Sequence, residues 1–281
     1  MKKIITSVVA CSTLLVGICG GGWTNPKGEY YAKLNQSVLS GNKFFTRSGE
    51  LTDITTFSLY TTSMYGEYAV HDRFTGILNL PFLSRPVLNK EVSSNTGAEV
   101  APGDSYTGIG DIDLGIKYGI LKDSKFVLAG SVYLGLPTGA VGVGKTQLLQ
   151  TGDGEFNQLL QLDLSTSFNS FFTSVKAGIN NRTKGFSEEF RYGAEFGYAK
   201  GKVIAIAKLD GVESFFNGDE NAGNGGSIFS NNLEYMAWTM EAGYFVTKSL
   251  GVGASIIGAI SGRNILGAPN YNASIFYQFK K

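Results

Sequence analysis

The sequence predicts an all-β fold: a transmembrane antiparallel β-barrel of about twelve strands, with short periplasmic turns and longer extracellular loops. Three observations carry this prediction. Apolar and polar residues alternate along most of the chain, and the segments that alternate are joined by connections that are short and long in turn. The composition is rich in Gly (38), Tyr (14) and Phe (19) and poor in Pro (6). A mean hydropathy of +0.01 is too polar for a bundle of membrane helices, whereas a barrel needs an apolar outer face, a polar inner face and aromatic girdles.

The clearest alternation runs from residue 110 to 120. One face carries Ile112, Leu114, Ile116, Tyr118 and Ile120, and the other carries Asp111, Asp113, Gly115, Lys117 and Gly119. Charges at every second position of an apolar strand require water on one face only. The same pattern recurs over 189–198, where Glu189, Arg191 and Glu195 share the polar face.

Weaker alternation extends the prediction to the whole chain. The expected strands are 29–39, 54–69, 74–83, 109–120, 126–137, 157–167, 171–181, 188–199, 202–213, 232–245, 251–261 and 270–279. Each is long enough to cross a membrane as a tilted strand of roughly 9–11 residues. Their number is even, as in bacterial single-chain barrels, so both ends of the barrel domain are expected on the periplasmic side.

The connections predict which end of the barrel is which. The short ones are 70–73, 121–125, 168–170, 200–201 and 246–250, and the longer ones are 40–53, 84–108, 138–156, 182–187, 214–231 and 262–269. Aromatic residues flank the short turns, among them Tyr68, Phe74, Tyr118, Phe126, Phe171 and Tyr244. Aromatic residues drawn from many strands to one level indicate an interfacial girdle.

Residues 1–22 have the pattern of a secretory signal peptide, which leaves 23–281 as the barrel domain. Lys2 and Lys3 precede an apolar stretch that is short for a membrane helix, and small residues follow it. We expect cleavage between Cys19 and Trp23. Lipidation at Cys11 is the alternative. Both cysteines of the chain lie in this segment, so no disulfide framework is expected.

A water-soluble β-sandwich or a lipocalin-like barrel would also show alternation. Its apolar face would point inward, and regular loop asymmetry and a girdle would not be needed. A formal net charge of +1 without a basic face argues against a nucleic-acid partner.

Two motifs have catalytic or binding readings that their context disfavours. Residues 139–146 match the phosphate-binding loop pattern, but only Gln147–Gln150 follow before a Gly-rich break, so no long helix can present its N-terminus to a phosphate. His71, the one histidine, lies in a short turn, which suits a turn residue better than a hydrolase triad.

The charged residues on the polar faces of 110–120 and 189–198 are interpreted as a hydrated lumen wall. The alternative is a carboxylate pair for catalysis or metal binding. The candidate lumen-lining residues are Glu67, Asp111, Asp113, Lys117, Asp163, Lys176, Glu189, Arg191, Glu195 and Glu241. Their mixed signs predict no strong preference for anions or cations. Loop segments 152–155 and 218–221 could bind calcium weakly, but their spacing is not that of a defined calcium loop. No catalytic residue, cofactor or resident metal is expected.

One strand resembles a known family. Gly108–Tyr118 is similar to a Gly-x-Gly-Asp-x-x-Leu-Gly-x-Lys-Tyr strand of the MetA-pathway phenol-degradation family of outer-membrane proteins. Leu134–Gly139 and Tyr68–Arg73 resemble the segments that follow and precede that strand there. The resemblance implies an outer-membrane barrel that takes up aromatic or other hydrophobic compounds, and it brings no catalytic residues.

The leading functional hypothesis is therefore a channel or transporter for small molecules, hydrophobic or aromatic ones included, in the bacterial outer membrane. Its expected partners are membrane lipid and a small solute. Because small barrels can be filled by side chains, a closed structural or adhesion barrel that acts through its loops is the second hypothesis. A barrel hydrolase is the third.

Overall fold

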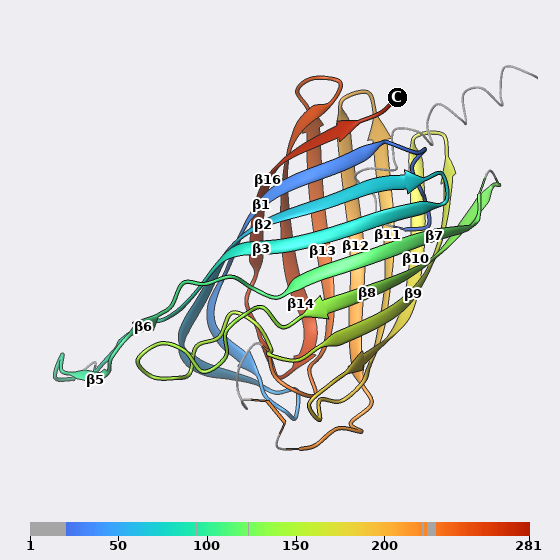
Figure 1. Ribbon diagram of the computed structural model, residues 1–281. Helices are drawn as coiled ribbons and strands as arrows, with labels where there is room; N and C mark the ends of the chain where they lie inside the picture. Colours follow the sequence, from blue (N-terminus) through green and yellow to red (C-terminus); the bar gives the residue numbers. More distant parts are fainter. Residues whose placement is uncertain (1–20, 94, 123, 221, 224–228) are drawn as a thin grey trace, which may run out of the picture.

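The computed structural model describes residues 21–93, 95–122, 124–220, 222–223 and 229–281 (Figure 1). The signal peptide expected over 1–22 lies outside these residues, apart from Gly21 and Gly22. The long strands are β1 (Tyr30–Phe45), β2 (Leu51–His71), β3 (Phe74–Leu88), β7 (Ile112–Leu121), β8 (Phe126–Leu136), β9 (Asn157–Phe168), β10 (Phe171–Arg182), β11 (Glu189–Lys200), β12 (Val203–Ser214), β13 (Glu234–Phe245), β14 (Leu250–Arg263) and β16 (Asn270–Phe279). No helix in the described residues is long and apolar enough to cross a membrane.

These twelve strands form one closed antiparallel barrel. Each pairs with its neighbour along the chain, and β1 pairs with both β2 and β16. Closure leaves every long strand with a partner on each side, so the barrel wall has no free edge. The predicted all-β barrel of about twelve strands is confirmed.

Short turns gather at one end, the upper end of Figure 1, where the C-terminus also lies. These turns are 72–73, 169–170, 201–202 and 246–249, together with the connection between β7 and β8, of which 122 and 124–125 are described. We call this the short-turn end and the opposite one the long-loop end. The prediction of a long connection over 40–53 is wrong: β1 and β2 continue as a paired hairpin, and only 46–50 turn. Lys43 pairs with Asp53 in register and forms an ion pair with it, which extends the ladder beyond the apolar segment.

The connection expected over 84–108 also carries strand structure. β3 runs on to Leu88 and pairs there with β6 (Asp104–Ser105). Beyond it, β4 (Glu91–Val92) and β5 (Glu99–Ala101) form a separate two-stranded hairpin. In Figure 1 this hairpin projects away from the barrel. A last short strand, β15 (Ile265–Leu266), pairs with the end of β1.

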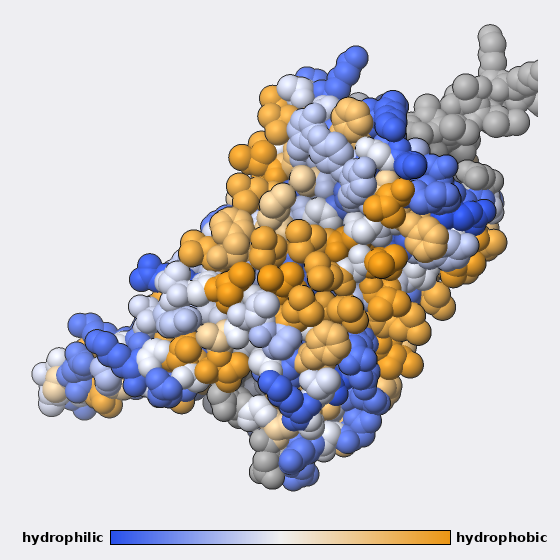
Figure 2. Space-filling view, in the orientation of Figure 1, coloured by the Kyte–Doolittle hydropathy of each residue, from blue (hydrophilic) through white to orange (hydrophobic). Residues whose placement is uncertain are grey.

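Side chains alternate between the two faces of the wall as the sequence pattern predicts. On β7, Leu114 and Ile116 are 43% and 61% exposed, whereas Lys117 is 4% exposed and points inward. Figure 2 shows apolar side chains gathered in a band around the middle of the visible face, with polar ones toward both ends. At the short-turn end, neighbouring strands contribute ring contacts on the outer face, such as Phe74 with Tyr118, whose centroids are 4.8 Å apart. This is the arrangement of a wall in contact with lipid.

Candidate functional site

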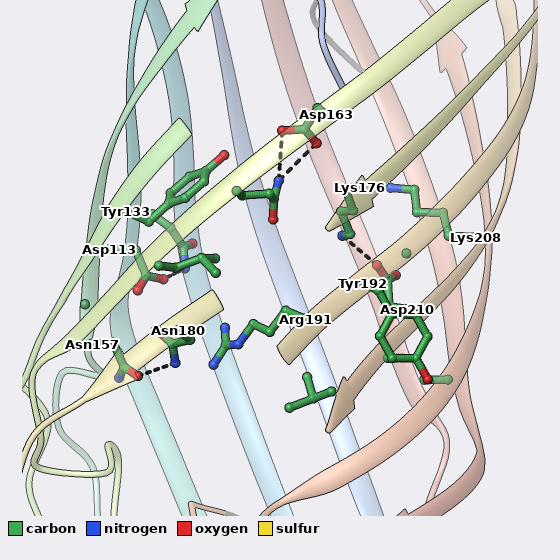
Figure 3. Close-up of a pocket in the computed structure, with 18 of the residues that line it drawn as sticks. Asp113, Tyr133, Asn157, Asp163, Lys176, Asn180, Arg191, Tyr192, Lys208 and Asp210 are labelled. Atoms are coloured by element: carbon green, nitrogen blue, oxygen red, sulfur yellow. Dashed lines mark hydrogen bonds and ion pairs between the residues drawn. The ribbon is translucent and has the colours of Figure 1, made fainter. Parts of the chain in front are cut away.

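The lumen contains a cavity of about 750 Å³ whose wall is formed by β2, β3 and β7 to β14 (Figure 3). Of the ten residues that the sequence marks as lumen-lining, the structure places eight on this cavity: Glu67, Asp111, Asp113, Lys117, Asp163, Lys176, Arg191 and Glu195. Glu189 and Glu241 lie against the wall in ion pairs. The alternation of period two brings these residues inward from strands far apart in the sequence.

One group of lumen charges is paired directly. Glu241 of β13 accepts hydrogen bonds from Lys33 of β1 at 2.8 Å and from Lys208 of β12 at 3.1 Å. Lys176 of β10 contacts Asp210 of β12 at 2.6 Å. Figure 3 shows Lys176, Lys208 and Asp210 on one side of the cavity. Charges withdrawn from bulk water are tolerated when they are paired in this way.

Lys117 is different, because in the described part of the chain no carboxylate oxygen lies within 4.0 Å of its ammonium group. It faces Glu67, Asp163 and Glu195 at longer range. Neutral groups bond two of these carboxylates: Tyr65 donates to Glu67, and Gln161 donates to Asp163 at 3.0 Å. Asp113 likewise accepts a hydrogen bond from the Asn79 amide at 3.0 Å.

At the long-loop end, Arg182 joins the barrel to the loop 137–156. Its side chain is 5% exposed, and its guanidinium contacts Glu155 at 2.9 Å, Glu189 at 2.8 Å and Asp153 at 3.3 Å. Arg191 contacts the second oxygen of Glu189 at 2.8 Å. A guanidinium can serve several carboxylates at once because its donors form a planar fork. The carboxylates of 152–155, considered above as weak calcium ligands, are therefore engaged by an arginine.

The phosphate-binding loop pattern folds as part of this same outer loop. Thr146 donates to Asp104 through its backbone nitrogen at 2.8 Å and through its hydroxyl at 2.7 Å. Gly142 and Gly144 adopt positive φ, which an L side chain rarely does. Backbone N–H groups that converge after such glycines form an anion-binding concavity. Here the anion is a carboxylate of the chain itself.

The chain that precedes β1 enters the lumen at the short-turn end. The Gly22 amide donates to the Ser165 hydroxyl at 2.8 Å, and Gly21 lies on the cavity wall. A Cβ at Gly22 would lie 2.7 Å from the Asp163 carbonyl oxygen, so a side chain would not fit there. The segment that precedes β1 therefore borders the cavity at this end, and it continues into an aromatic cluster at Trp23.

A cluster of buried apolar residues lies inside the barrel beside the short turns. Trp23 is 7% exposed and meets Phe172 edge to face, with centroids 6.2 Å apart. The cluster consists of Trp23, Tyr31, Phe172, Ala199, Ile204, Ile206, Phe245 and Phe276. The lumen thus has a charged cavity toward the long loops and an apolar plug toward the short turns.

His71 ends β2 at the short-turn end, away from the cavity. Its Nδ1 accepts a hydrogen bond from the Arg73 amide at 3.3 Å, and its ring lies 6.2 Å from that of Phe74. Within the described residues, no group of three or more His, Cys, Asp or Glu side chains is placed to hold a metal ion.

Sequence reasoning missed several residues of the site. Lys208 and Asp210 continue the inward face of β12 after Ile204 and Ile206, and strict counting by two along that strand would have found them. Asn180, which is fully buried on the cavity wall, could be found in the same way on β10. Nothing in the sequence pattern predicts that Trp23 folds into the lumen.

A closed antiparallel barrel with an apolar outer band and a charged interior is the architecture of outer-membrane β-barrels. Comparison with solved structures agrees. The chain is similar in fold to an outer-membrane channel from Pseudomonas putida F1, with a TM-score of 0.64 and 14% identity over 93% of this chain and 99% of that one. It also resembles the translocator domain of the autotransporter NalP from Neisseria meningitidis (TM-score 0.50, 9% identity, 100% and 95% covered).

The β domain of the Bordetella autotransporter BrkA is similar as well (TM-score 0.50, 13% identity, 90% and 100% covered). At these identities the likeness shows the fold. No protein-family model matches the chain, and no curated protein matches it in sequence.

Proposed function

We propose that this protein is an outer-membrane channel of narrow bore for small solutes. The single observation that carries the proposal is the cavity of about 750 Å³ inside a closed barrel wall. A barrel whose only role is structural needs no such space, because side chains can fill a small barrel completely. With the short turns in the periplasm, as in barrels of this architecture, the long-loop end faces outside and the aromatic plug faces the periplasm.

For the solute, the proposal extends to small molecules that combine an apolar ring with polar groups. The resemblance of Gly108–Tyr118 to the phenol-degradation family supports an aromatic solute, and the charged cavity supports a polar one. Such a molecule would meet charged side chains first and the cluster around Trp23 and Phe172 afterwards. We propose no catalytic residue.

The experiment is single-channel recording in a planar bilayer with wild type and Trp23→Ala. Trp23 belongs to the segment before β1 and is part of the aromatic plug, so its truncation should widen the path of the solute through the lumen and raise the conductance. Phe168→Ala is the matched control: it removes an aromatic ring at the same end that is 74% exposed on the outer face. A conductance that is absent in all three proteins would contradict the channel.

The closed structural or adhesion barrel remains the second candidate, and the observation that favours it is the aromatic plug at the short-turn end. Conductance separates the two. The hydrolase is tested by measuring ester hydrolysis before and after His71→Ala. A loss of hydrolysis in that variant would replace our proposal by an enzyme.

A further inference from the structure

We propose that the outer wall of the barrel carries a binding site for an anionic phospholipid. The acyl chains lie in an apolar groove across β11 to β14 and β16, and the phosphate lies at the lysines of the adjacent short turns. We call these lysines the lysine cluster: Lys200, Lys202 and Lys248. Because the short turns of outer-membrane barrels face the periplasm, the lipid belongs to the periplasmic leaflet. The inference goes beyond the proposed channel and needs only a barrel in a membrane.

The groove has a volume of about 700 Å³ and lies on the lipid-facing side of the wall. The strand register places Ala205, Ala242 and Ala254 side by side on three neighbouring strands. Their small side chains leave the wall recessed between larger apolar ones, which are Phe196, Tyr198, Met240, Ile256 and Tyr271. Phe196, Met240 and Tyr271 are exposed on the outer face, so the recess opens toward lipid.

The lining of the groove suits an acyl chain. Glu241 also borders it, but its carboxylate points inward and pairs there with Lys33 and Lys208. The side chains that face the groove are therefore apolar. Dispersion attraction depends on close approach of many atoms, so a chain that fills a recess makes contacts that a convex wall does not offer.

The lysine cluster lies beside the groove on the same strands. Lys200 ends β11 two residues after Tyr198, so the two side chains point to the same face. The Lys202 ammonium lies 5.8 Å from the centroid of the Tyr244 ring. Tyr244 follows Ala242 by two residues on β13 and is exposed on the outer face. The cluster thus lies at the level of the aromatic girdle, which is the level of the lipid headgroups.

The lysine cluster has no acidic partner. Lys202 and Lys248 belong to neighbouring turns, since Lys202 Nζ donates to the Val246 carbonyl at 3.4 Å. No carboxylate oxygen of the described chain lies within 4.0 Å of any of the three ammonium groups. The stretches 196–207 and 242–255 contain no Asp or Glu. Three exposed positive charges are therefore open to an anion from outside the chain.

The cluster is part of a separation of charge along the whole molecule. The lumen cavity carries seven carboxylates and four basic side chains. At the long-loop end, Lys43, Arg47 and Arg263 form ion pairs with carboxylates. The short-turn end has nine Lys and Arg against three Asp and Glu in the segments 24–29, 72–73, 122–125, 169–170, 200–202, 246–249 and 280–281. Basic residues gathered at a headgroup layer attract anionic lipid.

The groove and the lysine cluster together favour an anionic phospholipid over other occupants. A zwitterionic phospholipid fills the groove, but its own cationic group offsets the charge of its phosphate. A free phosphate brings the charge without a chain. A second copy of this barrel brings apolar side chains to the groove but no anion to the lysines.

The test is native mass spectrometry of the purified full chain in a non-ionic detergent. The probes are phosphatidylglycerol, phosphatidylcholine with the same acyl chains, and glycerol phosphate. Wild type should retain phosphatidylglycerol several-fold better than phosphatidylcholine and should not retain glycerol phosphate. Lys202→Gln should lower the retention of phosphatidylglycerol about fivefold, which corresponds to about 1 kcal/mol, the contribution of one basic side chain near anionic headgroups.

The control for charge is Lys125→Gln. The Lys125 ammonium lies 5.7 Å from the centroid of the Phe126 ring at the same end of the barrel, but Lys125 does not line the groove. This variant should retain phosphatidylglycerol like wild type. An equal loss in Lys125→Gln and Lys202→Gln would overturn the inference, because it would show a diffuse attraction by the whole end.

The groove is tested without a change of charge by Ala242→Leu. An apolar side chain on the outer face is compatible with lipid, so the variant should fold, fill the recess and lose phosphatidylglycerol several-fold. Val132→Leu, on the exposed outer face of β8, is its control and should behave like wild type. Each variant is first checked for the folded gel mobility of the wild type.

Three further outcomes would overturn the inference. They are equal retention of the two phospholipids by wild type, retention of glycerol phosphate as strong as that of phosphatidylglycerol, and wild-type retention in folded Ala242→Leu. A wild-type dimer that Ala242→Leu dissociates without a change in lipid retention would assign the groove to a second copy instead. Because none of these measurements needs conduction, a barrel without conductance would contradict the channel and leave the lipid site to be judged separately.

Discussion

Two aspartates at the long-loop end have pKa values that their local surroundings shift in opposite directions. Burial raises the pKa of Asp111 to about 6, and the nearby Asp153 charge adds to the rise. Hydrogen bonds from the Thr146 hydroxyl and backbone nitrogen lower the pKa of Asp104 to about 2. At neutral pH both carboxylates are charged, but Asp111 loses its charge before Asp104 as the pH falls.

The raised pKa of Asp111 predicts that the ion selectivity of the channel depends on pH. The Asp111 carboxyl becomes neutral as the pH falls through about 6, which makes the cavity wall less negative. The permeability ratio of potassium to chloride should therefore fall as the pH drops from about 8 to about 5. Reversal potentials across a salt gradient measure this ratio. In Asp111→Asn the step near pH 6 should be absent. An unchanged step in that variant would assign it to another group.

We expect Asp104 to keep the outer loop 137–156 ordered through its hydrogen bonds with Thr146. Because the pKa of Asp104 is lowered, its hydrogen bonds with Thr146 stabilise the loop fully at any pH above the ordinary pKa of an aspartate. They are lost only as the pH falls toward 2. Asp104→Ala should leave the barrel folded at neutral pH but let trypsin cleave after Lys145, which is exposed in the same loop, several-fold faster.

Lys145→Ala should fold and conduct like wild type. Specific nucleotide binding that Lys145→Ala abolishes would instead support the phosphate-loop reading.

At the scale of an element, β7 shows how one strand separates lipid from lumen. Leu114 points outward, and its neighbour Asp113 points inward to the Asn79 amide. A side-chain period of two makes the two positions opposite in character, and a slip of one residue would exchange every side chain on the strand.

The prediction on β7 compares Leu114→Arg with Asp113→Arg. An arginine on the lipid face near mid-membrane costs roughly 2–4 kcal/mol, so Leu114→Arg should refold poorly into lipid vesicles. Asp113→Arg lies in the cavity, where it should fold and shift ion selectivity toward anions. Refolding yields read from gel mobility give the answer. If Asp113→Arg fails and Leu114→Arg folds, the assignment of the inner and outer faces of β7 is wrong.

Element boundaries show where sequence patterns are least informative. The strands at 126–137, 171–181 and 270–279 agree with β8, β10 and β16 to within about a residue, because turns and membrane thickness limit both ends. The connections at 40–53 and 84–108 do not agree, because paired strands can extend beyond the membrane with polar residues. Alternation of apolar and polar residues gives no signal for such a polar ladder.

The whole molecule is held together by closure. β1 pairs with β2 on one side and with β16 on the other, so the ladder is complete only when the last strand has formed. Its outer face remains apolar over the middle band (Figure 2). Such a molecule should unfold as one unit and should need an amphiphile to stay in solution.

The corresponding prediction concerns the purified protein. It should require detergent, give a circular dichroism spectrum rich in β-structure, and migrate differently in gels before and after boiling, because a closed barrel resists detergent until heated. A monomer that is stable in buffer without detergent would contradict the membrane barrel and favour a soluble β-barrel.

The sequence by itself determined the strand period, the inner and outer faces and the alternation of short and long connections, because each depends on residues close together in the chain. The tertiary structure alone decided which charges meet. Lys33 and Glu241 form an ion pair although 208 positions separate them, because barrel closure brings the first strand near the thirteenth. It also decided that Trp23 fills the lumen and that the cavity wall carries excess negative charge. These properties depend on neighbours across a closed ring, and a pattern read along one strand contains no information about the strands on the other side.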